Sequence, residues 1–214
     1  MYNIISKKGV FFGMIEIYIF VNPIDYTKRD SLMNLFKLIQ KSSQNIKFQI
    51  VPLATMPLMD QYFNAHLIPR SNLEKRNFLF NKAHQIALYY ETLVTISKNV
   101  AIDFLFNSLE LLEDDNYDFD SIHQLFNNIG DNCCSCFDKY YQNYIEIAKE
   151  KNASNLLLLN ELGIQNLSSL VIYNFNSTSD FAIRLDSLND FQLIKSLIES
   201  TSIQDTLKQQ EINY

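Results

Sequence analysis

Residues 15–28 read IEIYIFVNPIDYTK, and the rest of the chain is arranged around this stretch. Its first seven residues are mostly β-branched or aromatic, which predicts a strand over residues 15–21. The pair Asn22-Pro23 then ends the strand. From Lys28 to Ser42 apolar residues recur at helical spacing, so we predict a helix that packs one face on a sheet. That face carries Leu32, Leu35, Phe36 and Ile39.

A second strand is predicted over residues 45–51, where polar and apolar side chains alternate up to Pro52. The right-handed crossover rule makes the two strands parallel neighbours in one sheet. From Leu58 to about Asn152 no segment has the pattern of a strand. We expect four helices there: a long one capped by Asn72, then residues 101–112, residues 118–129 ended by Gly130, and residues 131–151.

The last part of the chain returns to a mixed pattern. We predict a short helix over residues 155–163 closed by Gly163, because glycine commonly ends helices. Strands follow over residues 169–175 and 181–185, joined by a turn at residues 176–180. The last helix spans residues 189–200, with Phe191, Ile194, Leu197 and Ile198 inward.

These elements predict an α/β fold in which a helical subdomain interrupts a sheet domain. The sheet domain comprises residues 14–57 and 153–200, and the helical insertion residues 58–152. Residues 201–214 form a polar tail. Residues 1–13 are expected to be a disordered or optional leader, with Met14 as an alternative start. A signal peptide is not expected, because Glu16 interrupts the apolar run and no small-residue cleavage site follows it.

Composition narrows the class of protein. The chain has 214 residues, of which 47% are hydrophobic and 13% aromatic, and this excludes a disordered chain. Its net charge of −6 argues against nonspecific nucleic-acid binding. The apolar run of residues 9–21 is too short to span a bilayer. The three cysteines are crowded into residues 133–136 and cannot build a long-range disulfide framework, so we expect a cytoplasmic protein.

The cysteines are the first candidates for chemistry. Cys133, Cys134 and Cys136 include a Cys-x-x-Cys pair, which could be a displaced redox pair or half of a zinc site. Zinc needs two further ligands, and of the three histidines only His123 lies near in sequence. Free cysteine is equally at home in a helix as a small apolar residue. We therefore expect neither a metal nor a cofactor, with Cys133, Cys136 and His123 as the only candidate ligands.

Paired tyrosines on the expected helices are the second candidates. Tyr89-Tyr90 and Tyr140-Tyr141 are neighbours in sequence, and neighbours do not share one helix face. We therefore predict that one tyrosine of each pair lies outside the core. Exposed tyrosine is enriched at protein-binding surfaces.

Two segments carry a resemblance to a known family. Residues 15–23, IEIYIFVNP, resemble the strand that leads into Asp-Pro-x-Cys in the DsbA-like branch of the thioredoxin superfamily. Residues 160–172, NELGIQNLSSLVI, are similar to that branch's Leu-Gly-Ile-x-Gly-Thr-Pro-Thr-x-Val-Ile, whose proline is cis and faces the active cysteines. The order of elements, βαβ and ββα halves around a helical insertion, is also similar. The resemblance implies a thioredoxin-like fold.

The chain departs from this family where the family does its chemistry. Asp25 and Lys28 stand at the two thiol positions, and Ser168 stands at the place of the cis-proline. A thiolate is the nucleophile in disulfide exchange, and neither residue can replace it. A cis bond before a residue other than proline costs roughly 3–4 kcal/mol, so we predict a trans bond before Ser168. We expect Asp25 to be a capping carboxylate, Lys28 to be solvated, and no catalytic residue.

Within that branch the chain is most similar to the YjbH/SpxH group of low-GC Gram-positive bacteria. This resemblance implies a non-catalytic cytoplasmic adaptor that binds an Spx-like regulator and presents it to the ClpXP protease. Its partners would be proteins, with no nucleic acid and no membrane, and the oligomeric state stays open. Two enzymatic alternatives remain. One is a DsbA-like thiol-disulfide oxidoreductase or isomerase; the other is an enzyme like the kappa-class glutathione transferases, with Thr27 as the hydroxyl near the turn.

Overall fold

The structure is a computed structural model that describes residues 2–6, 14–113, 119–133, 137–166, 168–174 and 181–199. The chain divides into two compact units. The sheet unit comprises Met1–Phe20, Asp30–Val51 and Asn166–Tyr214, and the helical unit comprises Val21–Arg29 and Pro52–Gln165. The elements follow the order ββαβ, five helices, ββα along the chain, with a short 3-10 turn before the first helix.

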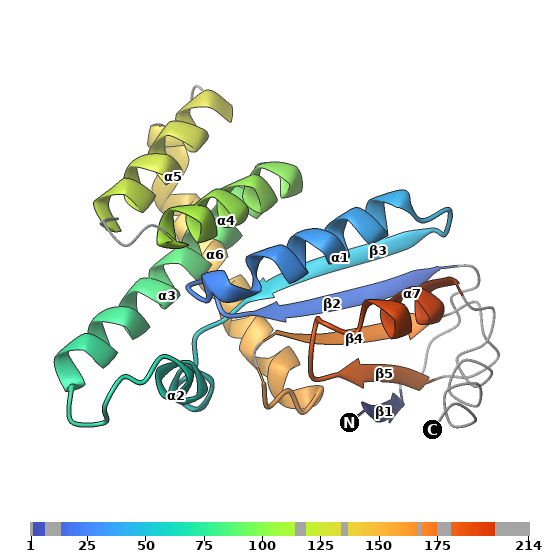
Figure 1. Ribbon diagram of the computed structural model, residues 1–214. Helices are drawn as coiled ribbons and strands as arrows, with labels where there is room; N and C mark the ends of the chain where they lie inside the picture. Colours follow the sequence, from blue (N-terminus) through green and yellow to red (C-terminus); the bar gives the residue numbers. More distant parts are fainter. Residues whose placement is uncertain are drawn as a thin grey trace. The chain divides into compact units, whose positions relative to one another are not determined.

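The described strands form one five-stranded sheet with the order β1-β5-β4-β2-β3 (Figure 1). They are β1 (Tyr2–Ser6), β2 (Ile15–Val21), β3 (Ile46–Pro52), β4 (Ser169–Asn174) and β5 (Phe181–Leu185). Strand β4 runs antiparallel to both β2 and β5, and β5 runs antiparallel to β1. The arrows of β2 and β3 point the same way in Figure 1, which confirms the predicted parallel pair. The predicted turn at residues 176–180 lies outside the described residues.

Strand β1 corrects one expectation. Residues 1–13 were expected to be a disordered leader, but Tyr2–Ser6 pairs with β5 along its whole length. The sequence pattern missed it because a short edge strand has few positions from which a period can be read. Residues 7–13 lie outside the described part of the chain.

Two helices cover one face of the sheet. Helix α1 (Arg29–Lys41) and helix α7 (Phe191–Glu199) lie on the same side of it (Figure 1). The Ser31 hydroxyl donates to Asn189 Oδ1 at 2.8 Å, which joins the beginnings of both helices. The apolar face predicted for α1 is buried, except that Phe36 is half-buried. In α7 the predicted inward residues are buried, but Phe191 is half-buried because it is the first residue of the helix.

The helical unit contains the five helices of the insertion. They are α2 (Met56–Ala65), α3 (Leu73–Val94), α4 (Lys98–Glu113), α5 (Phe119–Cys133) and α6 (Phe137–Glu161). Asn72 caps α3 as predicted, since its Oδ1 accepts a hydrogen bond from the Lys75 amide at 3.1 Å. Helix α2 was not predicted. None of the helices in the described residues combines the length and apolar character needed to cross a bilayer.

The boundaries of α5 and α6 differ from the prediction. Helix α5 continues through Gly130, because a buried glycine inside a helix costs only about 1 kcal/mol relative to alanine. Helix α6 is continuous where two helices were predicted to meet near Ser154. The Ser154 hydroxyl donates back to the Glu150 carbonyl at 3.0 Å, so it caps no new helix. Gly163 does close α6, with φ of 61° and the bond from Ile164 N–H to Leu159 O at 3.0 Å.

The core of the helical unit corrects the prediction about tyrosine pairs. Tyr89 and Tyr90 are both buried, with exposed fractions of 5% and 2%. Tyr89 stacks on Phe126 of α5 with ring centroids 4.0 Å apart. Helix α3 also packs on α6. A helix covered on two sides buries neighbouring positions, and the sequence does not show how many sides are covered. The side chains of residues 140 and 141 lie outside the described set.

Candidate functional site

We call the turn that follows β2, residues 22–28, the junction, because it contains the positions at which the resemblance to the DsbA-like branch places the two thiols. It begins with Asn22, which is buried. The Asn22 Oδ1 accepts a hydrogen bond from the Ile24 amide at 3.1 Å. The Asn22 Nδ2 donates to the Met59 sulfur at 3.6 Å and so ties the junction to α2. Asn22 therefore has a structural role, as an Asx turn that starts the junction.

Asp25 does not cap a helix, so that prediction is wrong. It precedes the 3-10 turn η1 (Tyr26–Lys28), and its side chain accepts no backbone hydrogen bond at the start of that turn. Its Oδ1 instead accepts from the Thr27 hydroxyl at 2.6 Å. The Thr27 hydroxyl thus takes the place of a backbone N–H as the donor to this carboxylate, since local side-chain hydrogen bonds compete with helix capping. Among the described residues, Asp25 makes no ion pair with Lys28.

Asp25 faces a histidine that sequence reasoning missed. His66, directly after α2, places its Nε2 atom 3.9 Å from Asp25 Oδ1. The His66 ring lies against Tyr62, with centroids 4.2 Å apart, and its centroid is 6.1 Å from that of Tyr26. Asp25 and His66 have side-chain exposures of 17% and 25%, so water reaches both. The spacing of Tyr62 and His66, four residues apart, was the one available signal that they share a helix face.

The junction is also attached to α4. Arg29, the first residue of α1, pairs through Nη2 with Glu110 Oε2 at 2.6 Å. The Arg29 side chain is 20% exposed, while Glu110 is 62% exposed and meets it from the solvent side. Thus the end of the junction is held by an ion pair to the insertion, and its beginning by Asn22 and Met59.

Ser168 is the residue that the resemblance matches to the cis-proline. It has φ of 76°, an unusual value for a residue other than glycine. Its backbone N–H donates to Phe20 O at 2.8 Å, which adds a bond beyond the paired residues of β2 and β4. Proline has no N–H and could not make this bond. No cis peptide bond occurs among the described residues, but Leu167, which forms the bond before Ser168, lies outside them.

The candidate metal ligands are only partly described. Cys133 is the last residue of α5, its side chain is outside the described set, and residues 134–136 are outside it entirely. Figure 1 draws this end of α5 far from the junction within the helical unit. His123 is engaged through both ring nitrogens, with Tyr89 Oη 2.6 Å from Nδ1 and Asn127 Nδ2 3.1 Å from Nε2. No group of three or more metal-binding side chains was found in the part of the chain that is described.

The junction brings a hydroxyl, a carboxylate and an imidazole close together. The Thr27 hydroxyl donates a hydrogen bond to Asp25 Oδ1 at 2.6 Å. His66 lies against Asp25 and two tyrosine rings, and no described contact links it to Thr27. What the junction offers is a partly exposed aromatic and polar surface.

Comparison with known proteins agrees with this fold. A search of curated proteins finds no relative of the chain. The crystal structure of a proposed protein disulfide isomerase from Nitrosomonas europaea is similar, with a TM-score of 0.56 and 10% sequence identity over 92% of this chain and 98% of that one. At that identity the likeness concerns the fold alone. A family model described as thioredoxin matches residues 18–196, which span both halves of the sheet and the whole insertion. The chain therefore belongs to the thioredoxin family.

Proposed function

We propose that this protein binds another protein and does not catalyse disulfide exchange. The observation that carries the proposal is the junction itself, where Asp25 and Lys28 replace the two thiols and the Asp25 carboxylate is bonded to Thr27. Disulfide exchange requires a thiolate at this place, activated by the start of the helix. A thioredoxin fold that keeps the surrounding frame without the thiols retains a surface for protein recognition.

More specifically, we propose a cytoplasmic adaptor of the YjbH/SpxH type that binds an Spx-like regulator and promotes its degradation by ClpXP. Support for this form comes from the resemblance of residues 15–23 and 160–172 and from the order of the elements. The family match is compatible with it and equally compatible with other thioredoxin-fold binding proteins.

The adaptor role is tested by recovering the protein's partners from the native cell. Tagged protein should recover an Spx-like regulator and a ClpXP subunit, and deletion of the gene should lengthen the lifetime of that regulator. Recovery of neither protein, together with unchanged turnover, contradicts the adaptor role but leaves the family assignment intact.

The proposal that the protein does not catalyse disulfide exchange is tested by an activity assay. Purified protein should show no turnover in insulin reduction or dithiol oxidation. Turnover that disappears in a Cys133→Ser, Cys134→Ser, Cys136→Ser variant would assign activity to the displaced cysteines. Turnover that persists in that variant would contradict our account of where thiol chemistry can occur.

A second candidate is an enzyme of the disulfide isomerase or glutathione transferase type. The observation that favours it is the similarity in fold to the proposed isomerase. For a transferase, the Thr27 hydroxyl would have to leave Asp25 and donate to the glutathione thiolate. Calorimetric titration with glutathione separates the two candidates. Binding that is lost in Thr27→Ala supports the transferase, and absence of binding supports the protein-binding role.

A further inference from the structure

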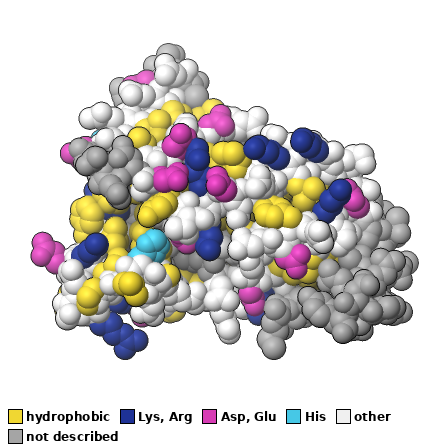
Figure 2. All heavy atoms as spheres, in the orientation of Figure 1, with side chains coloured by type: hydrophobic (Ala, Val, Ile, Leu, Met, Phe, Trp, Pro, Cys, Tyr) yellow, Lys and Arg dark blue, Asp and Glu magenta, His cyan; other side chains and the backbone are white. Residues whose placement is uncertain are grey.

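The loop between α2 and α3 and the first turn of α3 carry exposed apolar and basic side chains. We call Leu67, Arg70, Leu73 and Lys75 the α2–α3 corner. Leu67 is 88% exposed and Leu73 is 64% exposed, and Leu67 is the most exposed large apolar side chain among the described residues. Figure 2 shows yellow and dark blue side chains mixed over this part of the helical unit. Scattered single leucines are ordinary on a surface, so the case rests on further features of this corner.

Leu67 has an unfavourable backbone conformation. Helix α2 ends with a bond from Ile68 N–H to Phe63 O at 2.8 Å and one from Leu67 N–H to Asn64 O at 3.2 Å. This hydrogen-bond pattern requires a left-handed residue after the helix, and Leu67 supplies it with φ of 54°. Glycine is the usual residue there because a Cβ atom crowds the backbone in that conformation. Because the Leu67 side chain is exposed, its burial does not offset the cost of this backbone conformation.

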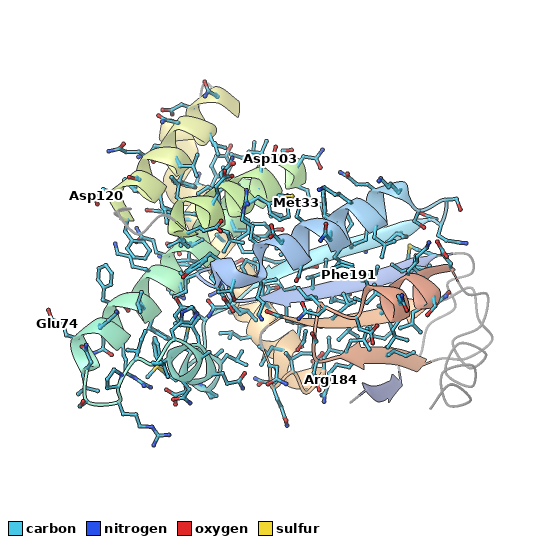
Figure 3. The ribbon with its side chains drawn as sticks, viewed as in Figure 1. Met33, Glu74, Asp103, Asp120, Arg184 and Phe191 are labelled. Carbon is cyan, nitrogen blue, oxygen red and sulfur yellow. The ribbon has the colours of Figure 1, made fainter. Side chains whose placement is uncertain are left out.

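The corner is basic in an acidic chain. Arg70 and Lys75 are exposed and form no ion pair with a described residue. Arg76, by contrast, is buried and pairs with Asp60. Glu74 is the only acidic residue between His66 and Lys82, and Figure 3 shows it at the outer end of α3. The chain as a whole carries a net charge of −6. Unpaired cations beside exposed leucines are complementary to a ligand with carboxylates and apolar side chains.

The corner begins one residue after the histidine that faces Asp25 of the junction. Leu67 directly follows His66, whose ring lies beside Asp25 and Tyr62. The junction and the corner both belong to the helical unit.

We propose that the α2–α3 corner docks an acidic segment of a partner protein. Apolar side chains of that segment cover Leu67 and Leu73, and its carboxylates meet Arg70 and Lys75. This inference rests on the proposed protein-binding function and names its surface and its class of partner. Two leucines and two cations are too few to hold the protein on a bilayer, because stable membrane anchoring requires at least two separate anchors, such as two lipid chains or one chain with a polybasic patch. An acidic protein segment therefore fits the corner better than a lipid surface.

The decisive variant is Leu67→Gly, because two readouts should move in opposite directions. Glycine relieves the left-handed backbone, so the midpoint of thermal unfolding should rise. It also removes the exposed anchor, so binding should weaken. The probe is a fluorescent synthetic peptide that combines glutamate and leucine, compared with the same peptide carrying lysine for glutamate. The full-length protein should bind the glutamate peptide and not the lysine peptide in an anisotropy titration.

Leu67→Gly and Arg70→Glu should each weaken binding of the glutamate peptide by roughly tenfold or more, the size expected for a residue that anchors an interface. The control is Leu157→Ala on α6, since Leu157 is 65% exposed and lies outside the corner. It should leave the affinity unchanged. Failure of the glutamate peptide to bind, or equal affinity of Leu67→Gly and the unaltered protein, overturns the inference.

Two other occupants are separated by the same variants. Binding to phosphatidylserine vesicles that is lost in Leu67→Gly, without peptide binding, would replace the inference with a membrane surface. Concentration-dependent self-association that is lost in the same variant would replace it with a second copy of this chain. A native partner recovered equally well by the double variant Leu67→Gly, Arg70→Glu overturns the corner while the proposed function stands. If no partner is recovered and regulator turnover is unchanged, the adaptor function fails, whatever the peptide does.

Discussion

The sheet unit and the helical unit bury different kinds of side chain. In the sheet unit, the buried polar residues that are described are uncharged and lie in or beside β4: Ser168, Ser169 and Asn174. Among the described residues, the helical unit buries one basic and one acidic side chain, Arg76 and Glu91, with exposed fractions of 8% and 2%. Each has a single described polar partner, Asp60 for Arg76 and Asn155 for Glu91. Buried charges with few partners make stability sensitive to pH and to single substitutions. The stability of the helical unit should therefore change more with pH and with single substitutions than that of the sheet unit.

The largest expected effect tests the apolar core of the helical unit. Phe126 is fully buried, stacked on Tyr89 and edge-on to Phe104 at 6.1 Å. Phe126→Ala should lower the free energy of unfolding by about 3–5 kcal/mol, through lost burial and the cavity left behind. Urea denaturation measures this. The control is Phe78→Ala, since Phe78 is 49% exposed, and its cost should be about 1 kcal/mol or less. Equal losses for the two variants would mean that the aromatic cluster is not the core.

A smaller effect concerns Arg76, whose guanidinium carbon lies 4.4 Å from the centroid of the Phe63 ring. Arg76→Ala should cost about 2 kcal/mol, because the stack on Phe63 and the pair with Asp60 are both lost. Arg76→Met should cost less, since methionine refills the space against the ring. Asp60 is 47% exposed and water can solvate it in either variant. If both variants lose the same stability in urea denaturation, the ion pair and not the packing dominates.

Glu91 should make the stability of the helical unit depend on pH. Burial raises the pKa of the Glu91 carboxyl, while the hydrogen bond from Asn155 and the charge of Lys151 partly oppose that rise. Because the folded pKa lies above the unfolded one, the folded state holds the proton more tightly. The contribution of Glu91 to stability is therefore greatest below its unfolded pKa and falls as pH rises through the folded pKa.

Glu91→Gln removes this charge and keeps an acceptor for Asn155 Nδ2. Near neutral pH it should raise the free energy of unfolding by roughly 1 kcal/mol, and the gain over the unaltered protein should shrink as the pH is lowered. Denaturation at several pH values measures this gain. The control is Glu150→Gln, at an exposed position of α6, and it should show no such trend. A gain that grows toward acid pH would contradict the sign of the shift.

The smallest effect tests a local feature of the helical unit. Asn72→Ala removes the side chain that accepts from the Lys75 amide, and should cost about 1 kcal/mol. Asn77→Ala, at an exposed position inside α3, should cost nothing or slightly stabilise the helix, because alanine is the better helix former. If the two variants behave alike, the cap contributes nothing measurable to the fold.

Sequence alone determined the features that act over a few residues. The strand over residues 15–21, the α1 helix, the Asn72 cap and the Gly163 end of α6 were all predicted, because periodicity and caps depend on near neighbours. The identity of Asp25 and Lys28 at the thiol positions also needed no structure. These features predicted an α/β fold with a helical insertion, and the resemblance of residues 15–23 and 160–172 to a known family implied that the fold is thioredoxin-like.

Tertiary structure decided what depends on residues far apart in the chain. It paired β1 with β5, placed His66 beside Asp25, and buried both Tyr89 and Tyr90. It also turned Asp25 from an expected cap into the acceptor of a side-chain hydrogen bond. None of these could be read locally, because sequence periodicity shows that a face is apolar but not how many neighbours cover it. Which polar groups meet in the folded chain is set by packing between elements that lie tens of residues apart.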